Sequence, residues 1–142
     1  MTTINAYLNF NGNCEEVFNF YASVFGSEPP MFNRFKAFHS EDGLDDTNEG
    51  EKIMHVALPL GNGTVLMGSD TVAAMGEVTF GDNFSLSLQV DSQEEADNLY
   101  KQLSAGGVAT MPLAHAPWGD YFGMLTDQFG IQWMINHAQS QA

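Results

Sequence analysis

Alternating apolar and polar residues predict most of the strands in this chain. The clearest case is the stretch 118–136, WGDYFGMLTDQFGIQWMIN, in which two runs rich in strand-forming residues flank a short link that starts with Asp127 and ends with Gly130. Asp and Gly at these positions are typical of a hairpin loop whose last residue needs a positive φ. Similar runs predict further strands at 2–10, 31–38, 52–60, 64–68, 85–90 and 108–113.

Apolar residues at helical spacing predict two helices. The first covers 14–25, with its apolar positions on one face, and the second starts after Asp91 and Ser92 and ends before Gly106. Each predicted helix follows a polar residue with Glu three positions later, which is the pattern of a capping box. The two expected capping pairs are Asn13 with Glu16 and Ser92 with Glu95.

The remaining segments are predicted to be turns and loops. Gly61-Asn62-Gly63 predicts a tight hairpin between two strands, since Asn-Gly is a strong hairpin signal. Strand-forming residues follow these glycines, whereas a nucleotide or methyl-donor loop would lead into a helix. The acidic segment 39–51 is expected to be a mobile loop, and 70–82 a connection between two halves.

The order of predicted elements repeats within the chain. At a constant offset, Glu15-Glu16 align with Glu94-Glu95 and Tyr21 aligns with Tyr100. Each half reads strand, helix, strand, strand, strand, and one such unit has too little core to fold alone. We therefore predict an α+β fold of two βαβββ modules, at about 1–70 and 83–138, that form a cupped mixed β-sheet with the helices outside, within one domain over 1–142. The concave face of the sheet is the expected ligand site.

Charge and cysteine content exclude several classes of function. The chain has 18 acidic and 4 basic residues, a formal net charge of −14, so it would repel nucleic acid and is not expected to bind it. One cysteine, Cys14, excludes an internal disulfide framework and a multi-cysteine metal site. No apolar run predicts a signal peptide or a membrane span, and a cytoplasmic location is expected.

Several of these segments resemble a known family. The paired βαβββ pattern, FYASVFG, HVALPLGNGTVLMGSD and the 118–136 hairpin are similar to the vicinal oxygen chelate superfamily (the glyoxalase/bleomycin resistance/dioxygenase fold), and most of all to its PhnB-like members, over about residues 3–137. The resemblance implies a homodimer. It also places the superfamily's four metal-ligand positions at Asn5, Met67, Ser85 and Met134.

Those four residues do not suit the superfamily's metals. Divalent ions of this kind prefer imidazole and carboxylate ligands, whereas thioethers are soft and uncharged. Shifting the register by one residue brings Ala6, Leu66, Leu86 and Ile135, which are no better. We therefore expect no metal at these positions, and no cofactor.

Other residues could still contribute chemistry. Alternation places His55 on the strand face shared with Ala57 and Pro59. In the stretch HAPWGD, His115 and Asp120 could act as an acid–base pair and Trp118 could stack on a planar ligand; a polar loop anchored by Trp118 is the simpler interpretation.

The leading functional hypothesis is a metal-free protein that binds a small molecule. The residues expected to line its site are Asn5, Tyr7, His55, Met67, Ser85, Trp118, Asp120 and Met134. Two alternatives stay open: a lyase, isomerase or dioxygenase with a relocated metal site at His55, His115 and Asp120, and a protein that sequesters a cationic antibiotic.

Overall fold

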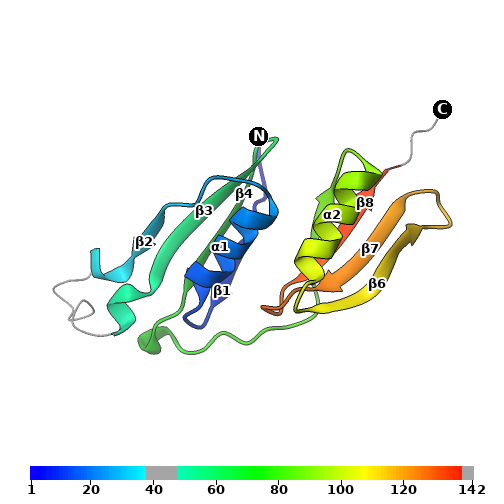
Figure 1. Cartoon of the computed structure of the whole chain (residues 1–142). Helices are drawn as coiled ribbons and strands as arrows, with labels where there is room; N and C mark the ends of the chain where they lie inside the picture. Colours follow the sequence, from blue (N-terminus) through cyan, green and yellow to red (C-terminus); the bar gives the residue numbers. More distant parts are fainter. Residues whose placement is uncertain (38–47, 139–142) are drawn as a thin grey trace. The chain divides into compact units, whose positions relative to one another are not determined.

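The protein consists of two compact units with the same order of elements (Figure 1). A computed structural model of the chain describes residues 1–37 and 48–138. The units are Met1–Thr79 and Phe80–Ala142. The first contains β1 (Tyr7–Phe10), α1 (Cys14–Val24), β2 (Phe32–Arg34), β3 (Ile53–Gly61) and β4 (Thr64–Asp70), with short 3-10 turns η1 (Phe35–Ala37), η4 (Asn48–Glu51) and η5 (Ala73–Met75). The second contains β5 (Leu86–Gln89), α2 (Gln93–Ser104), β6 (Val108–His115), β7 (Tyr121–Thr126) and β8 (Gln132–His137).

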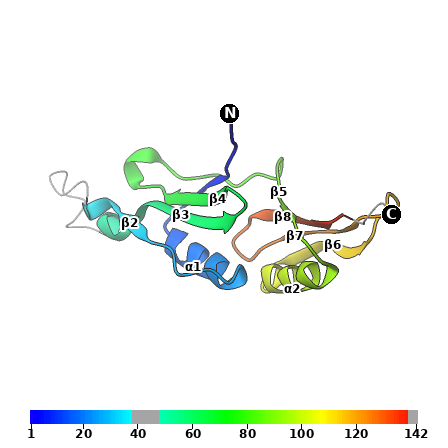
Figure 2. The same ribbon diagram turned by 90° about the horizontal axis from the view of Figure 1, so that it is seen from above.

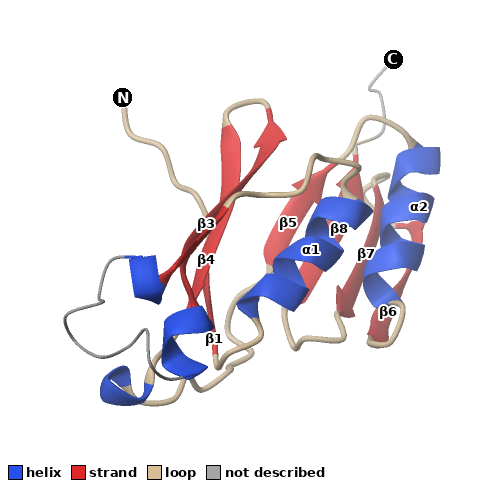
Figure 3. Cartoon of the chain, turned by 60° about the vertical axis from the view of Figure 1, so that its left-hand side comes forward, coloured by secondary structure: helices blue, strands red, loops and turns tan. Residues whose placement is uncertain are grey.

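Each unit folds its four strands into one mixed sheet of equivalent order. The first sheet runs β1-β4-β3-β2 and the second runs β5-β8-β7-β6. In both, the strand before the helix pairs in parallel with the last strand of the unit, and the other neighbours are antiparallel. β3 and β4 form a long hairpin that turns at Asn62 and Gly63, both with positive φ (Figure 3). The predicted α+β class and the two βαβββ modules are confirmed.

One face of each sheet packs against its own helix (Figure 2). Alternation decides which side chains are buried there, because successive residues of a strand point to opposite faces. The first core gathers buried side chains from α1 and three strands, and the second gathers them from α2, β7 and β8. The largest of these are Phe10, Phe18, Tyr21, Ile53 and Leu58 in the first unit and Leu103, Leu125, Trp133 and Ile135 in the second.

Gly68 lets α1 approach the first sheet closely. A Cβ added there would lie 2.6 Å from Phe18 Cε1 and 2.9 Å from the Leu8 carbonyl oxygen. Gly68→Ala is therefore expected to lower the free energy of unfolding by about 2 kcal/mol, the usual cost of overpacking, measured by chemical denaturation. Gly81→Ala is the control, because its added Cβ would come no closer than 3.5 Å to another atom. Equal stability of the two variants would contradict this account.

Several local predictions need correction. Residues 2–6 are not strand, and the strand predicted for 31–38 ends at Arg34, after which Phe35 turns into the core as part of η1. Of the loop predicted at 39–51, residues 39–47 lie outside the described residues and 48–51 form η4. The offset between equivalent residues of the two halves is not constant. Tyr7 pairs with Met67 as Ser87 pairs with Met134, so Tyr7 and Ser87 are equivalent. The separation of Tyr7 and Ser87 is one residue greater than that of the helix starts Cys14 and Gln93.

The two helices begin in different ways. At α2 the Glu95 amide donates to Ser92 Oγ (3.0 Å) and the Asp91 amide donates to Glu95 Oε1 (3.0 Å), which confirms the predicted cap. At α1 the Asn13 side chain makes no capping hydrogen bond, so the predicted capping box is wrong. Its place is taken by Asp70 at the end of β4, whose Oδ1 accepts from the amides of Gly12 (3.0 Å) and Cys14 (2.9 Å).

Candidate functional site

The face of the first sheet that points away from α1 brings three of the predicted ligand-binding residues together. Tyr7 on β1 pairs with Met67 on β4, and Met67 pairs in turn with Ala57 on β3. His55 lies two residues before Ala57 and therefore on the same face, as alternation predicted. We call this surface the first open face.

Tyr7 and His55 are in direct contact on the first open face. The Tyr7 hydroxyl oxygen lies 3.5 Å from His55 Nδ1, and the ring centroids are 5.8 Å apart with the planes tilted by 32°. Tyr7 is 44% exposed and His55 partly exposed, so both rings are accessible to a ligand.

The corresponding face of the second sheet contains Met134. Met134 pairs with Ser87 on β5 and with Met124 on β7, which places two thioethers and a hydroxyl side by side. Asn136, two residues further along β8, shares this face, which we call the second open face.

Polar and aromatic groups surround Asn136. Its side-chain amide donates to Gln89 Oε1 (3.0 Å) and to Asp120 Oδ2 (3.2 Å). Its strand neighbour Phe122 has its ring centroid 6.1 Å from that of Trp118, which is 64% exposed. Trp118, Asp120 and Met134, all predicted from the sequence, therefore lie in one neighbourhood. The sequence-based set missed Asn136 and Gln89, although Asn136 could have been found by alternation from Met134.

His115 belongs to a different cluster from Asp120. Its ring centroid is 5.1 Å from that of Tyr121, whose hydroxyl donates to Asp97 Oδ1 on α2 (2.6 Å). That hydrogen bond to Asp97 is the main reason why the pKa of Tyr121 is raised. His115 thus lies toward the helix side of the second sheet, whereas Asp120 bonds to Asn136 on the open face. Within residues 1–37 and 48–138, no group of three His, Cys, Asp or Glu side chains is placed to hold a metal ion.

The four superfamily metal positions carry poor ligands in the structure as well. The register sets Tyr7 rather than Asn5 opposite Met67, and Ser87 rather than Ser85 opposite Met134. Asn5 Oδ1 already accepts a hydrogen bond from the Val65 amide (3.0 Å). Two thioethers with two neutral oxygens do not fit a divalent metal that prefers imidazole and carboxylate. The residues present therefore do not suit the superfamily's metal.

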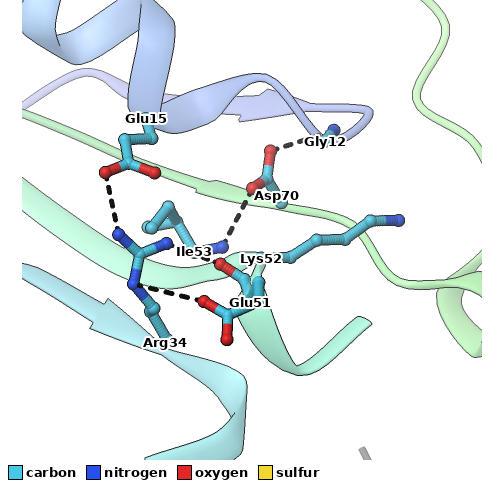
Figure 4. Close-up of a pocket in the computed structure, with 7 residues that line it drawn as sticks. All are labelled: Gly12, Glu15, Arg34, Glu51, Lys52, Ile53 and Asp70. Carbon is cyan, nitrogen blue, oxygen red and sulfur yellow. Dashed lines mark hydrogen bonds and ion pairs between the residues drawn. The ribbon is translucent and has the colours of Figure 1, made fainter. Parts of the chain in front are cut away.

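A charged pocket of about 410 Å³ lies at the start of α1 and was not anticipated from the sequence. Glu15 reaches into it from α1, Arg34 from β2 and Glu51 from the end of η4 (Figure 4). Arg34 donates through Nη2 to Glu15 Oε2 (2.8 Å) and through Nη1 to the Glu51 carbonyl oxygen (2.7 Å). The bond to Glu15 raises the pKa of Arg34. The remaining lining residues are Gly12, Lys52, Ile53 and Asp70.

Two of the chain's four basic residues, Arg34 and Lys52, line this pocket, and a third, Lys36, pairs with the lining residue Glu51. Lys36 pairs with Glu51, and Lys52 pairs with Glu49, so each cation next to the pocket already has a carboxylate partner. Asp70, 3% exposed, is likewise satisfied by three amides, the third being that of Ile53 (2.9 Å). The sequence signal was available, since Arg34, Lys36 and Lys52 are three of only four basic residues. The pairing indicates that these residues tie α1, β2 and η4 together.

The ion pair between Lys36 and Glu51 predicts a stability difference that depends on pH. The bond to Lys36 lowers the pKa of Glu51 below its usual value near 4.5. Its stabilising effect is therefore complete above that value and disappears as the pH falls through the lowered pKa of the folded state. Glu51→Gln should have a lower melting temperature than the parent protein at pH 7, and this difference should shrink as the pH falls below 4.5. Calorimetry across this pH range tests the prediction, and a difference that does not shrink with falling pH would contradict it.

Cys14 is part of the core rather than a reactive group. It is fully buried at the first turn of α1, and burial, followed by the nearby charge of Asp70, raises the pKa of its thiol. A raised pKa keeps the thiol protonated and unreactive at neutral pH.

None of the helices within the described ranges has the length and apolar character required to cross a membrane.

Comparison with solved structures finds the same architecture in several proteins. Protein PA1353 from Pseudomonas aeruginosa is 36% identical, with 99% of this chain and 100% of that chain covered and a TM-score of 0.79. The PhnB protein from Bacillus cereus is 28% identical, with 96% and 100% covered and a TM-score of 0.75. A glyoxalase-related enzyme from Fulvimarina pelagi, 19% identical with 97% and 89% covered and a TM-score of 0.64, shares the fold.

Sequence comparison agrees with the structural one. Protein YjdN of Escherichia coli (strain K12) is 28% identical over 144 residues, which cover 97% of each chain. Residues 2–136 match the family described as 3-demethylubiquinone-9 3-methyltransferase. The chain therefore belongs to this family, a PhnB-like branch of the proteins with the glyoxalase/bleomycin resistance/dioxygenase fold.

Proposed function

We propose that this protein binds a small, mainly apolar molecule on its open faces, without a metal at the four superfamily positions. The observation that carries the proposal is the composition of these faces. Each combines an accessible aromatic ring, a methionine and hydrogen-bonding side chains, namely Tyr7, Met67 and His55 on the first and Trp118, Met134 and Asn136 on the second.

These residue types suit a ligand that is flat and carries polar substituents. Exposed Tyr and Trp rings offer faces for stacking, and methionine adapts its shape to whatever packs against it. A few well-placed polar groups then fix the orientation of the ligand, as in most small-molecule sites. The net charge of −14 disfavours polyanions such as nucleotides.

The family description adds a class of ligand. It names methyl transfer to a demethylubiquinone, which has a substituted quinone ring, and such a ring would suit the neighbourhood of Trp118 and Phe122. The start of α1 does not suit an anionic group of a cofactor, because the carboxylate of Asp70 already accepts from the amides there. We therefore propose binding of a phenol or quinone ring, and do not assign methyl transfer.

Binding can be tested with protein labelled at the methionine methyl carbons with ¹³C, using methoxyhydroquinone as the probe. We expect the methyl signals of Met134 and Met124 to shift on titration, while those of Met31 and Met75 stay in place, since these two are exposed and lie outside the strands. Trp118→Ala should weaken binding about tenfold if stacking contributes about 1.4 kcal/mol, whereas Trp118→Phe should retain most of the affinity. Shifts confined to Met31 and Met75, or none at all, would refute the proposal.

We also propose that the protein is a cytoplasmic homodimer. The resemblance to vicinal oxygen chelate proteins, which are commonly dimers, supports the assembly, and a single buried cysteine suits a reducing compartment. Light scattering on the purified protein would test the assembly, and a monomeric mass would refute it.

A further inference from the structure

Tyr7 and His55 meet above the middle of the first sheet. They stand on β1 and β3, which are separated by β4, so their strands are about 10 Å apart. Only because both side chains lean over β4 do the hydroxyl oxygen and Nδ1 come within 3.5 Å of each other. The buried core on the other side of the sheet is formed without them, by residues such as Leu8 and Val56.

The contact leaves one hydrogen-bond donor for a ligand, whichever way it is made. If Tyr7 donates to Nδ1, the proton of a neutral imidazole is on Nε2 and is available. If Nδ1–H donates to the Tyr7 oxygen, the hydroxyl proton is available instead. Among the described residues, neither side chain makes another hydrogen bond that would use this donor.

The charge of the neighbouring residues indicates whether the ligand that accepts this hydrogen bond is cationic, anionic or neutral. The strand residues that share the first open face with Tyr7 and His55 are all neutral: Asn9, Asn33, Ala57, Pro59, Val65, Met67 and Ser69. A cationic ligand finds no carboxylate among them. An anionic ligand finds no fixed cation and meets a protein of net charge −14. A neutral acceptor is the class that these groups fit.

We propose that Tyr7 and His55 form a subsite for the carbonyl oxygen of a neutral ligand, with Met67 packing beside the ligand's apolar part. This inference rests on the proposed binding function and specifies the chemistry that the first open face recognises. A carbonyl oxygen accepts one hydrogen bond from the outward donor, and the adjacent thioether adapts to the remainder of the molecule.

Acetophenone and ethylbenzene provide the test, because they differ in the carbonyl oxygen and have similar shapes. Dissociation constants are measured from the Met67 methyl signal for the parent protein and for Tyr7→Phe/His55→Phe, which keeps an aromatic ring at each position and removes both side-chain donors. The ratio of the ethylbenzene constant to the acetophenone constant should fall about three- to tenfold in the double variant, the effect of one hydrogen bond. The matched control is Tyr121→Phe/His115→Phe, a second Tyr–His contact on the helix side of the other sheet, which should leave the ratio unchanged.

Two results would overturn the subsite, and they differ in what they say about binding. If both compounds shift Met67 but the ratio is the same in the Tyr7→Phe/His55→Phe variant, the carbonyl subsite is wrong and binding on the first open face stands. If neither compound shifts Met67 in the parent protein, the subsite fails together with the proposed binding on this face. Melting temperatures of both double variants establish that they are folded.

Discussion

Asp127→Ala is expected to lower the free energy of unfolding by about 4 kcal/mol, because it leaves several buried donors without an acceptor. Asp127 is 3% exposed. Its Oδ1 accepts from the amides of Phe129 (2.9 Å) and Ile131 (3.1 Å), and its Oδ2 accepts from Trp133 Nε1 (2.8 Å). Trp133 itself is 1% exposed, so its indole proton would find no water in place of the carboxylate.

Chemical denaturation followed by tryptophan fluorescence, to which Trp118 and Trp133 both contribute, measures this effect. Asp127→Asn is the control, since an amide keeps one acceptor oxygen and should cost about half as much as alanine. If the free energy of unfolding of Asp127→Ala lies within about 1 kcal/mol of the parent protein's, this account is contradicted. The three hydrogen bonds would then be hardly more favourable than the bonds that the same groups make with water.

Asp70→Ala is expected to lower the free energy of unfolding by about 3 kcal/mol, because Asp70 caps α1 and also bonds to β3. The amides of Gly12, Cys14 and Ile53 would all lose their acceptor. Asn13→Ala is the matched control. Asn13 occupies the N-cap position and makes no side-chain capping bond, so its removal should cost less than about 0.5 kcal/mol. If Asn13→Ala proved as destabilising as Asp70→Ala, the assignment of the cap to Asp70 would be wrong.

The elements that local patterns determine were predictable from the sequence. Alternation identified the face of His55, and the Ser92–Glu95 cap lies within one turn of the chain. The cap of α1 was not predictable, because Asp70 is 56 residues from Cys14 and reaches it through the parallel pairing of β1 with β4. The strand at 31–38 was predicted too long, because apolar periodicity does not distinguish a strand from a turn that places Phe35 in the core.

The candidate site was predictable in its residue types and less so in its contacts. Met67 and Met134 were found from the resemblance, and the sequence alone shows that their thioethers are poor ligands for a divalent metal. Their pairing partners Tyr7 and Ser87 are set by the register of the parallel strands. Aligning the two helices does not give this register, because the strands are offset by one residue more than the helices. The Tyr7–His55 contact and the Arg34 pocket join separate strands, so only the folded chain brings these residues together.

The central claim is that small-molecule binding replaces metal chemistry at the four superfamily positions, and one measurement tests it directly. Protein labelled at the methionine methyl carbons with ¹³C is purified without added metal, analysed for bound metal, and then titrated with Zn²⁺. We predict no stoichiometric metal in the purified protein and no movement of the Met67 and Met134 methyl signals during the titration, because thioethers and neutral oxygens hold divalent ions poorly. One metal ion per chain, together with shifts of both signals, would contradict the account.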